Sequence, residues 1–440
     1  MTQSAATAHT LDRVVGVPGA VLMGLGSILG TGIFVSIGLA AGVAGQALVP
    51  AIALAAVLAA LNGLSSAQLA ASHPVSGGAY EYGYRYLTPS LGFTAGWMFL
   101  CAKSASAASA ALGLAGYALG LLGASTPGLR VVVALAAVAA AAVVVASGIG
   151  RSARVNAVIV AATLASLAAF VAAGAPIAID RLGEATAREA WNAGPPADAA
   201  ALLHAVALMF VAYTGYGRIA TLGEEIRDPA SSIPRAIVAT LVCTAAIYVC
   251  VAAVAVAAGG AGTLADATSE AAPLAVIARS FGSAWVSPLV AAGAVAAMLG
   301  VLLNLVLGLS RVALAMVRRA DLPVALGHID AEQRSPRRAV IFVGLLVAAL
   351  VASGSVALTW SFSAFTVLVY YAINNLAALR LRPPARRYPR VIPAAGLVGC
   401  LGLAFFVDAA IWIAGLGLIA VGLAARRALS AVDVRTTARS

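Results

Sequence analysis

Long apolar runs recur along the whole chain, and they constrain its fold more than any other feature. Because a helix of about 20 residues crosses a hydrocarbon core of about 30 Å, each run is long enough to span a membrane. With 62% of residues apolar and 10% charged, lipid is the expected solvent for most of the chain. Twelve runs, numbered as spans in chain order, lie at 14–41, 46–70, 91–122, 129–148, 154–175, 201–222, 235–258, 284–316, 338–353, 355–379, 392–407 and 409–425.

These runs predict an all-α membrane protein of about 12 transmembrane helices. Only Asp408 separates the last two runs, so 11 spans remain possible. Alternation with a period of two is missing, which argues against a membrane barrel. The first run exceeds the length of a signal-peptide core and has no cleavage pattern, so we expect it to be retained.

The basic residues gather in alternate loops between the runs. If the amino terminus is cytoplasmic, twenty of the 27 basic residues lie on that side, against four on the other, and Lys103, Arg218 and Arg311 fall within or at the ends of spans. Basic loops remain on the cytoplasmic side of a membrane. The net charge of +11 is therefore a topology signal and not a nucleic-acid surface. It predicts an inner (plasma) membrane protein with both termini cytoplasmic.

Span one carries four glycines in nine residues, from Gly24 to Gly32. Glycine weakens a helix by about 1 kcal/mol per position, and unwound backbone inside a membrane persists only beside protein or a watery cavity. A break at Gly30 would leave the N–H groups of Thr31 and Gly32 free to bind a carboxylate. The alternative is close helix packing, because Gly26 and Gly30 also form a GxxxG face.

Span six repeats this pattern with Gly215 and Gly217 in its middle. A break there would free carbonyl groups near Val211 and Thr214, which could accept hydrogen bonds from an ammonium group. Interrupted helices at matching places in two halves of a chain point to a transporter's binding site. Together the two breaks would hold both ends of a zwitterion.

Three ordered motifs resemble the amino acid, polyamine and organocation (APC) superfamily of permeases. They are GSILGTGIF in span one, HPVSGGAYEY after span two and GEEIRDPASSIPRAI after span six. The resemblance implies a five-plus-five inverted repeat with broken helices one and six and two further carboxy-terminal helices. The implied segments are a cytoplasmic tail at 1–13, a first repeat at 14–175, a second repeat at 201–379, two spans at 392–425 and a cytoplasmic tail at 426–440.

The resemblance also assigns roles to residues. It implies that Ile28, Thr31 and Gly32, next to Gly30, bind the substrate carboxylate, and that Val211 and Thr214, next to Gly215, bind the amino group. It implies a cytoplasmic gate from Ser76 to Tyr82, which includes Gly77, Gly78 and Tyr80.

Three positions depart from the family pattern. Val211 stands where many members have an aromatic lid, so Tyr213, Tyr216 and Trp360 become candidates for that role. Arg218 follows the span-six glycine where many members have an acid; it could extend to the interface or pair with Glu224 or Glu225. Thr163 stands where proton-coupled relatives have a lysine in span five.

Lys103, the only lysine, lies about twelve residues into span three, which places it about 18 Å deep at 1.5 Å per residue. A charge at that depth is a functional candidate by default. Lys103 could exchange a proton during transport, or stay charged and hold an additional substrate carboxylate. A fixed structural charge paired within the bundle is the alternative.

The sequence therefore predicts a secondary transporter of an amino acid or similar amine-bearing solute, working by alternating access as a proton symporter or an exchanger. A solute sensor without transport and an organic cation or polyamine permease remain alternatives. The four histidines and four cysteines do not cluster, so we expect no enzyme activity, metal or cofactor. The substrate, its direction, proton or sodium coupling and the oligomeric state are left open.

Overall fold

The computed structural model describes residues 15–74, 77–124, 126–147, 153–183, 198–220, 226–270, 272–327 and 336–437. These residues are almost all helical, and the one β pairing among them is an isolated bridge between Val15 and Ile226. Nine helical segments in this part of the chain are long and apolar enough to cross a membrane. The predicted all-α, multi-pass membrane fold is confirmed.

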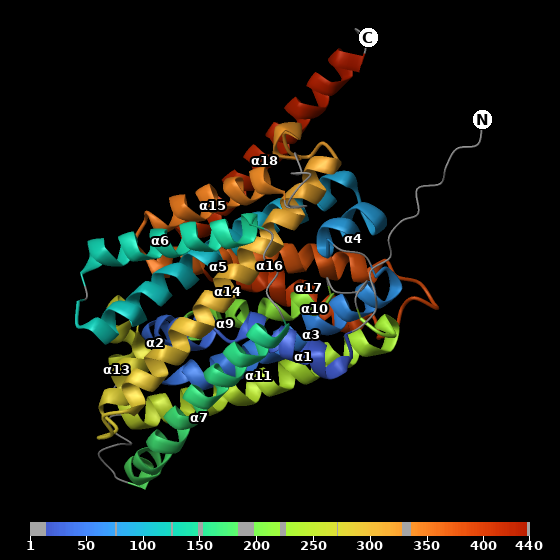
Figure 1. Ribbon diagram of the computed structural model, residues 1–440. Helices are drawn as coiled ribbons and strands as arrows, with labels where there is room; N and C mark the ends of the chain where they lie inside the picture. Colours follow the sequence, from blue (N-terminus) through green and yellow to red (C-terminus); the bar gives the residue numbers. More distant parts are fainter. Residues whose placement is uncertain are drawn as a thin grey trace.

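Each predicted apolar run contains a helix (Figure 1). The long helices are α3 (Leu48–Ser72), α5 (Pro89–Leu122), α6 (Pro127–Ala146), α7 (Ala153–Gly183), α11 (Pro229–Gly259), α14 (Val286–Arg318), α16 (Val356–Leu379) and α18 (Ala409–Thr437). The shorter helices within spans are α1 (Val17–Ile28), α2 (Ile37–Ala44), α9 (Ala199–Tyr213), α10 (Gly217–Ala220), α15 (Arg337–Val351) and α17 (Val391–Ala404). Three short helices connect spans: α4 (Ala79–Tyr86), α12 (Ala261–Asp266) and α13 (Pro273–Arg279).

Proline and glycine set several helix ends. Pro89 opens α5, where the side chain of Thr88 caps the helix by accepting a hydrogen bond from the N–H of Leu91. Proline suits the first turn because its missing N–H would have no acceptor there. Gly123, with φ of 66°, ends α5 in the left-handed conformation that glycine adopts without strain.

The helices differ in how much of their surface faces lipid. In the most apolar window of α5 and of α16, 78% of residues are buried, against 22% in α6 and 11% in α18. α5 packs against both α14 and α16, so these three helices form the centre of the bundle. α4 and the end of α18 lie at one end of the bundle, and α13 lies at the opposite end (Figure 1).

Two boundaries differ most from the predicted ones. α7 continues to Gly183, beyond the predicted end of span five at 175. α18 continues past 425, the predicted end of the last span, and carries Arg426 to Asp321, with which it forms an ion pair. Apolar periodicity alone does not reveal this helical extension, since the stretch beyond 425 is polar.

Candidate functional site

Span one is broken near its middle. α1 ends at Ile28, and Leu29 takes an extended conformation with ψ of 102°. The helix resumes at Thr31 with a π-helical turn over Gly32–Ser36, in which the N–H groups of Ile33 and Phe34 both donate to the carbonyl of Gly30 at 3.1 Å. The first N–H groups of a helix have no acceptor within that helix, so this second half begins with donors available to a ligand.

Span six is interrupted more gently than span one. Its α-helix ends at Tyr213, one 3-10 turn follows over Thr214–Tyr216, and α10 resumes at Gly217. The expectation was the same kind of break in both spans, but here the helix tightens without coming apart. Gly215 lies against span one, because a Cβ added to it would lie 2.6 Å from Cγ1 of Ile28.

Tyr248 of α11 joins the two interruptions. Its hydroxyl lies 3.0 Å from the carbonyl oxygen of Ile28 and 3.2 Å from that of Ala212. Carbonyls freed at the ends of half-helices need such partners inside a membrane. The sequence carries no sign of this role, since Tyr248 is one aromatic residue in a long apolar run.

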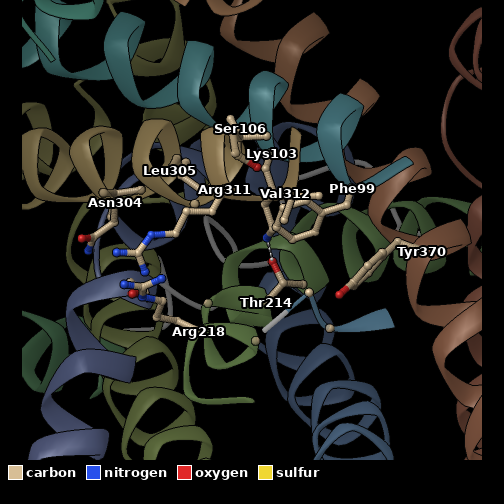
Figure 2. Close-up of a pocket in the computed structure, with 18 of the residues that line it drawn as sticks. Phe99, Lys103, Ser106, Thr214, Arg218, Asn304, Leu305, Arg311, Val312 and Tyr370 are labelled. Carbon is tan, nitrogen blue, oxygen red and sulfur yellow. Dashed lines mark hydrogen bonds between the residues drawn. The ribbon is translucent and has the colours of Figure 1, made fainter. Parts of the chain in front are cut away.

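Lys103 of α5 reaches the same place from the other side. Its Nζ donates to Oγ1 of Thr214 at 2.8 Å (Figure 2). The Thr214 hydroxyl donates in turn to the carbonyl of Val211 at 2.8 Å, and the Tyr371 hydroxyl donates to the carbonyl of Thr214 at 3.3 Å. The Val211 carbonyl also accepts the backbone N–H of Thr214, and the Thr214 carbonyl also accepts that of Gly217. The two carbonyls that we expect to receive an ammonium group therefore each accept two protein hydrogen bonds already, so an ammonium group would replace one of them.

A cavity of about 680 Å³ opens beside the two interruptions, between α1, α5, α9, α10, α14 and α16. The structure brings most of the predicted binding residues to it. Oγ1 of Thr31 is buried there and has no hydrogen-bond partner within the described residues. The predicted residues that line the cavity are Ile28, Thr31, Gly32, Gly77, Gly78, Lys103, Val211, Thr214, Gly215 and Trp360.

Several predicted residues are not among those that line the cavity. The hydroxyl of Thr163 donates to the carbonyl of Ile159 within its own helix. The Tyr213 hydroxyl donates to the carbonyl of Ile52 at 3.3 Å, and the ring of Tyr216 packs against that of Tyr371. The remaining predicted positions are Gly30 and Tyr80, which lie outside the lining, and Ser76, which lies outside the described residues.

Aromatic side chains beyond the predicted ones also line the cavity. Of the three lid candidates only Trp360 lines it, and its Nε1 donates to the carbonyl of Leu208 at 3.0 Å. Phe99, Tyr370 and Tyr371 also contribute to the wall. Sequence alone does not identify them, because aromatic residues in a membrane helix face lipid, core and cavity alike.

Basic side chains form much of one wall. Arg311 of α14 and Arg218 of α10 extend toward one another beside Asn304 (Figure 2). Arg318 and Arg319 follow at the end of α14. From the sequence, Arg311 was identified only as a basic residue within or at the end of a span. Its spacing of seven from both Asn304 and Arg318 would have placed all three on one helix face.

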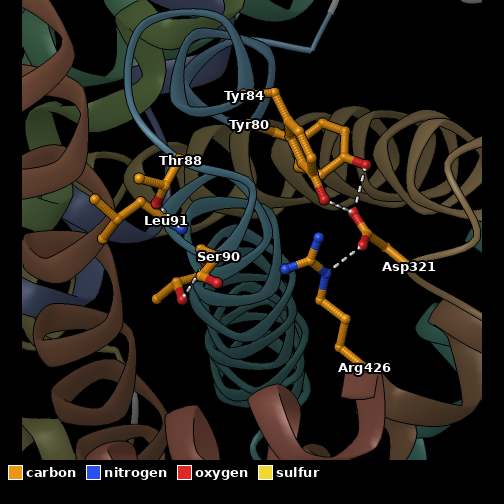
Figure 3. A network of polar contacts seen from close by, with 8 residues as sticks. Tyr80, Tyr84, Thr88, Ser90, Leu91, Asp321 and Arg426 are labelled. Carbon is orange, nitrogen blue, oxygen red and sulfur yellow. Dashed lines mark hydrogen bonds and ion pairs between the residues drawn. The ribbon is translucent and has the colours of Figure 1, made fainter. Parts of the chain in front are cut away.

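At the α4 end of the cavity, a polar network joins three helical regions (Figure 3). The carboxylate of Asp321 is buried and accepts hydrogen bonds from the hydroxyls of Tyr80 at 2.8 Å and Tyr84 at 2.5 Å, and from Nε of Arg426 at 2.8 Å. Burial and the bond to Asp321 raise the pKa of both tyrosines, so both remain donors at neutral pH. Arg319 forms an ion pair with Glu81 of α4 beside this network.

The bundle is packed on the α13 side of the interruptions. The Tyr117 hydroxyl donates to the carbonyl of Phe34 at 2.6 Å and accepts from the N–H of Leu274 at 3.2 Å. On the opposite side, the Arg319 side chain at the cavity wall is 40% exposed. The cavity therefore opens toward the α4 end of the bundle.

The chain is similar to known membrane transporters over nearly its whole length. A family model described as Amino acid permease matches residues 19–433. An uncharacterized transporter of Mycobacterium tuberculosis is 43% identical over 416 residues, which cover 94% of this chain and 91% of that protein. The branched-chain amino acid permease BcaP of Bacillus subtilis is 28% identical, with 90% and 86% covered. The cationic amino acid transporter 4, vacuolar, of Arabidopsis thaliana is 24% identical, with 86% of this chain and 64% of that protein covered.

Proposed function

Because this chain belongs to the amino acid permease family, we propose that it is a secondary transporter that carries an amino acid across the inner membrane by alternating access. The observation that supports this most is the break at Leu29 and Gly30, which opens onto a cavity of about 680 Å³. A broken helix beside a cavity offers peptide groups to a small zwitterion at membrane depth. Close packing of two intact helices would offer none.

In the proposed binding mode, the substrate carboxylate meets the start of the second half of span one. The N–H groups of Thr31 and Gly32 and the unpartnered hydroxyl of Thr31 are its donors. The ammonium group binds the carbonyls of Val211 and Thr214 in place of the hydrogen bonds that the hydroxyls of Thr214 and Tyr371 donate to them. Gly215 permits the close approach of spans one and six that this arrangement needs, and Gly30 leaves room for the side chain of Val301 in α14.

We assign the α4 end of the bundle to the cytoplasm, with both termini on that side. Arg85 lies in α4, Arg319 pairs with Glu81 of α4 and Arg426 pairs with Asp321 at this end, as expected for cytoplasmic loops. The structure is then an inward-open state, closed on the outside by contacts such as Tyr117 with Phe34. Gly77, Gly78 and Tyr80 belong to the cytoplasmic gate that closes when the outside opens, and Ser76 is expected to join them.

Lys103 is the proposed coupling residue, with the proton as coupling ion. It lies in the middle of α5 and bonds to Thr214, one of the proposed substrate-binding residues. A change of its charge would alter the substrate's surroundings directly. The Thr163 hydroxyl donates to the carbonyl of Ile159 in its own helix, so we assign Thr163 no role in coupling.

Purified protein provides the test of transport. A thermal-shift screen against the twenty amino acids and common polyamines should identify a ligand, and uptake of that ligand into proteoliposomes should follow at two pH values. The names of the relatives range from branched-chain to cationic amino acids, so the screen must include both classes. Accumulation driven by an inward proton gradient is the expected result. Binding without flux would identify a sensor instead.

A further inference from the structure

The cavity wall has a strong excess of positive charge. Among its described residues, five are basic, namely Lys103, Arg218, Arg311, Arg318 and Arg319, and one is acidic, Glu81. That one acid forms an ion pair with Arg319. The field inside the cavity therefore favours anions and repels a substrate with net positive charge.

The basic residues extend from the mouth into the membrane. Arg318 and Arg319 lie at the end of α14, where positive charge is usual for a cytoplasmic end. Arg311 lies seven residues earlier on the same face, about 10 Å deeper at 1.5 Å per residue. Lys103 lies beside the two helix interruptions. Topology explains the outer pair of arginines but not the two deeper cations.

Neither deeper cation has an acidic partner in the part of the chain that the structure describes. Lys103 donates to the neutral hydroxyl of Thr214. Arg311 is exposed to the cavity, and the two ion pairs among the described residues are Arg319 with Glu81 and Arg426 with Asp321. A charged side chain within a membrane span normally pairs with an opposite charge.

We propose that the substrate supplies this negative charge, so that the transported molecule is an acidic amino acid whose side-chain carboxylate binds between Arg311 and Lys103. This deepens the proposed function and rests on it. The guanidinium of Arg311 can hold a carboxylate through two parallel hydrogen bonds, and the amide of Asn304 is a further donor beside it. The α-carboxylate and ammonium would remain at the interruptions of spans one and six.

Isosteric pairs of amino acids provide the probes. L-glutamate and L-glutamine, or L-aspartate and L-asparagine, have similar shapes and differ in side-chain charge. Proteoliposomes with the wild-type protein should take up one acidic member at least about tenfold faster than its amide. A hydrogen bond to a charged group is more stable than a neutral one by a free energy that corresponds to about tenfold in affinity. Arg311→Gln should lower the ratio of acidic to amide uptake about tenfold or more, and Arg311→Lys should restore part of this ratio.

Arg279→Gln is the matched control, because it removes a positive charge from the exposed end of α13, away from the cavity. It should leave the selectivity unchanged. This inference is wrong if the wild type takes up neutral or cationic amino acids and acidic ones neither are taken up nor compete. The proposed function would then remain intact. Folded wild-type protein that transports no amino acid would overturn the proposed function itself. The wild-type preference for an acidic amino acid over its amide tests this inference even if Arg311→Gln fails to fold.

Discussion

The Nζ of Lys103 lies 2.8 Å from Oγ1 of Thr214, and this hydrogen bond ties the centre of α5 to the 3-10 turn of span six. A hydroxyl can accept this bond from a charged or a neutral amine. The contact therefore holds Lys103 in place without fixing its charge. A residue with this freedom, next to the proposed substrate, suits proton coupling.

Replacement of this amine tests the coupling. In Lys103→Ala, proton-driven uptake should fall about tenfold or more, because a charge-assisted hydrogen bond is lost from the site. Its pH profile should flatten between pH 5 and 9. Thr214→Val, which removes the acceptor and keeps the amine, should slow uptake but retain the pH profile. An uptake rate and pH profile unchanged in Lys103→Ala would show that the coupling residue lies elsewhere.

Tyr248 holds the two interruptions together, so loss of its hydroxyl should destabilise both. Tyr248→Phe leaves the carbonyls of Ile28 and Ala212 without this donor. A buried polar group left unsatisfied costs about 1–3 kcal/mol, and the free energy of unfolding in detergent should fall by about that amount. Tyr82→Phe is the control, because the Tyr82 hydroxyl is buried without a partner among the described residues. Equal stability of the two variants would contradict this role.

Much of the fold was predictable because membrane helices follow one strong rule. A long uninterrupted apolar run indicates a membrane span directly. The glycines around Gly30 correctly indicated where the helix of span one is broken. The gentler interruption of span six was not predictable. Glycine permits a break but does not require one, and here both the N–H and the hydroxyl of Thr214 donate to the carbonyl of Val211.

Residues of the site were predictable only where local backbone or an unusual charge marked them. Lys103 was identifiable as a lone deep charge, and the structure places it on the cavity wall. Tyr248 and Asp321 act through contacts with residues far along the chain, which local patterns do not encode. The sequence indicates that Arg311 shares a helix face with Asn304 and Arg318. Whether that face points into the cavity depends on how α14 packs against α5, which the sequence does not show.

Asp321 joins α4 to α18 through the hydroxyls of Tyr80 and Tyr84 and the guanidinium of Arg426, so its charge should hold α18 in its present position beside α4. Asp321→Asn should lower the free energy of unfolding by about 2 kcal/mol, less than for a fully buried pair because Arg426 is 21% exposed. Adding Arg426→Gln should recover part of this loss.

Protease cleavage within α18, followed over time, measures how firmly α18 is held. Asp321→Asn should accelerate this cleavage, because α18 loses its ion pair. Arg427→Gln removes the exposed neighbouring charge and should not change it. If the cleavage rate of Asp321→Asn matches that of the wild type, the network does not restrain α18.

The contact of Gly215 with span one should tolerate no side chain. A Cβ at this position would overlap the backbone carbonyl of Ser27 and lie 2.6 Å from Cγ1 of Ile28, and backbone cannot move aside as a flexible side chain can. Gly215→Ala should therefore cost about 1–3 kcal/mol of stability and abolish uptake, despite the higher helix propensity of alanine. Gly120→Ala, where an added Cβ has no atom within 4 Å, should be neutral or stabilising. Wild-type uptake by Gly215→Ala would mean that spans one and six are not in close contact during transport.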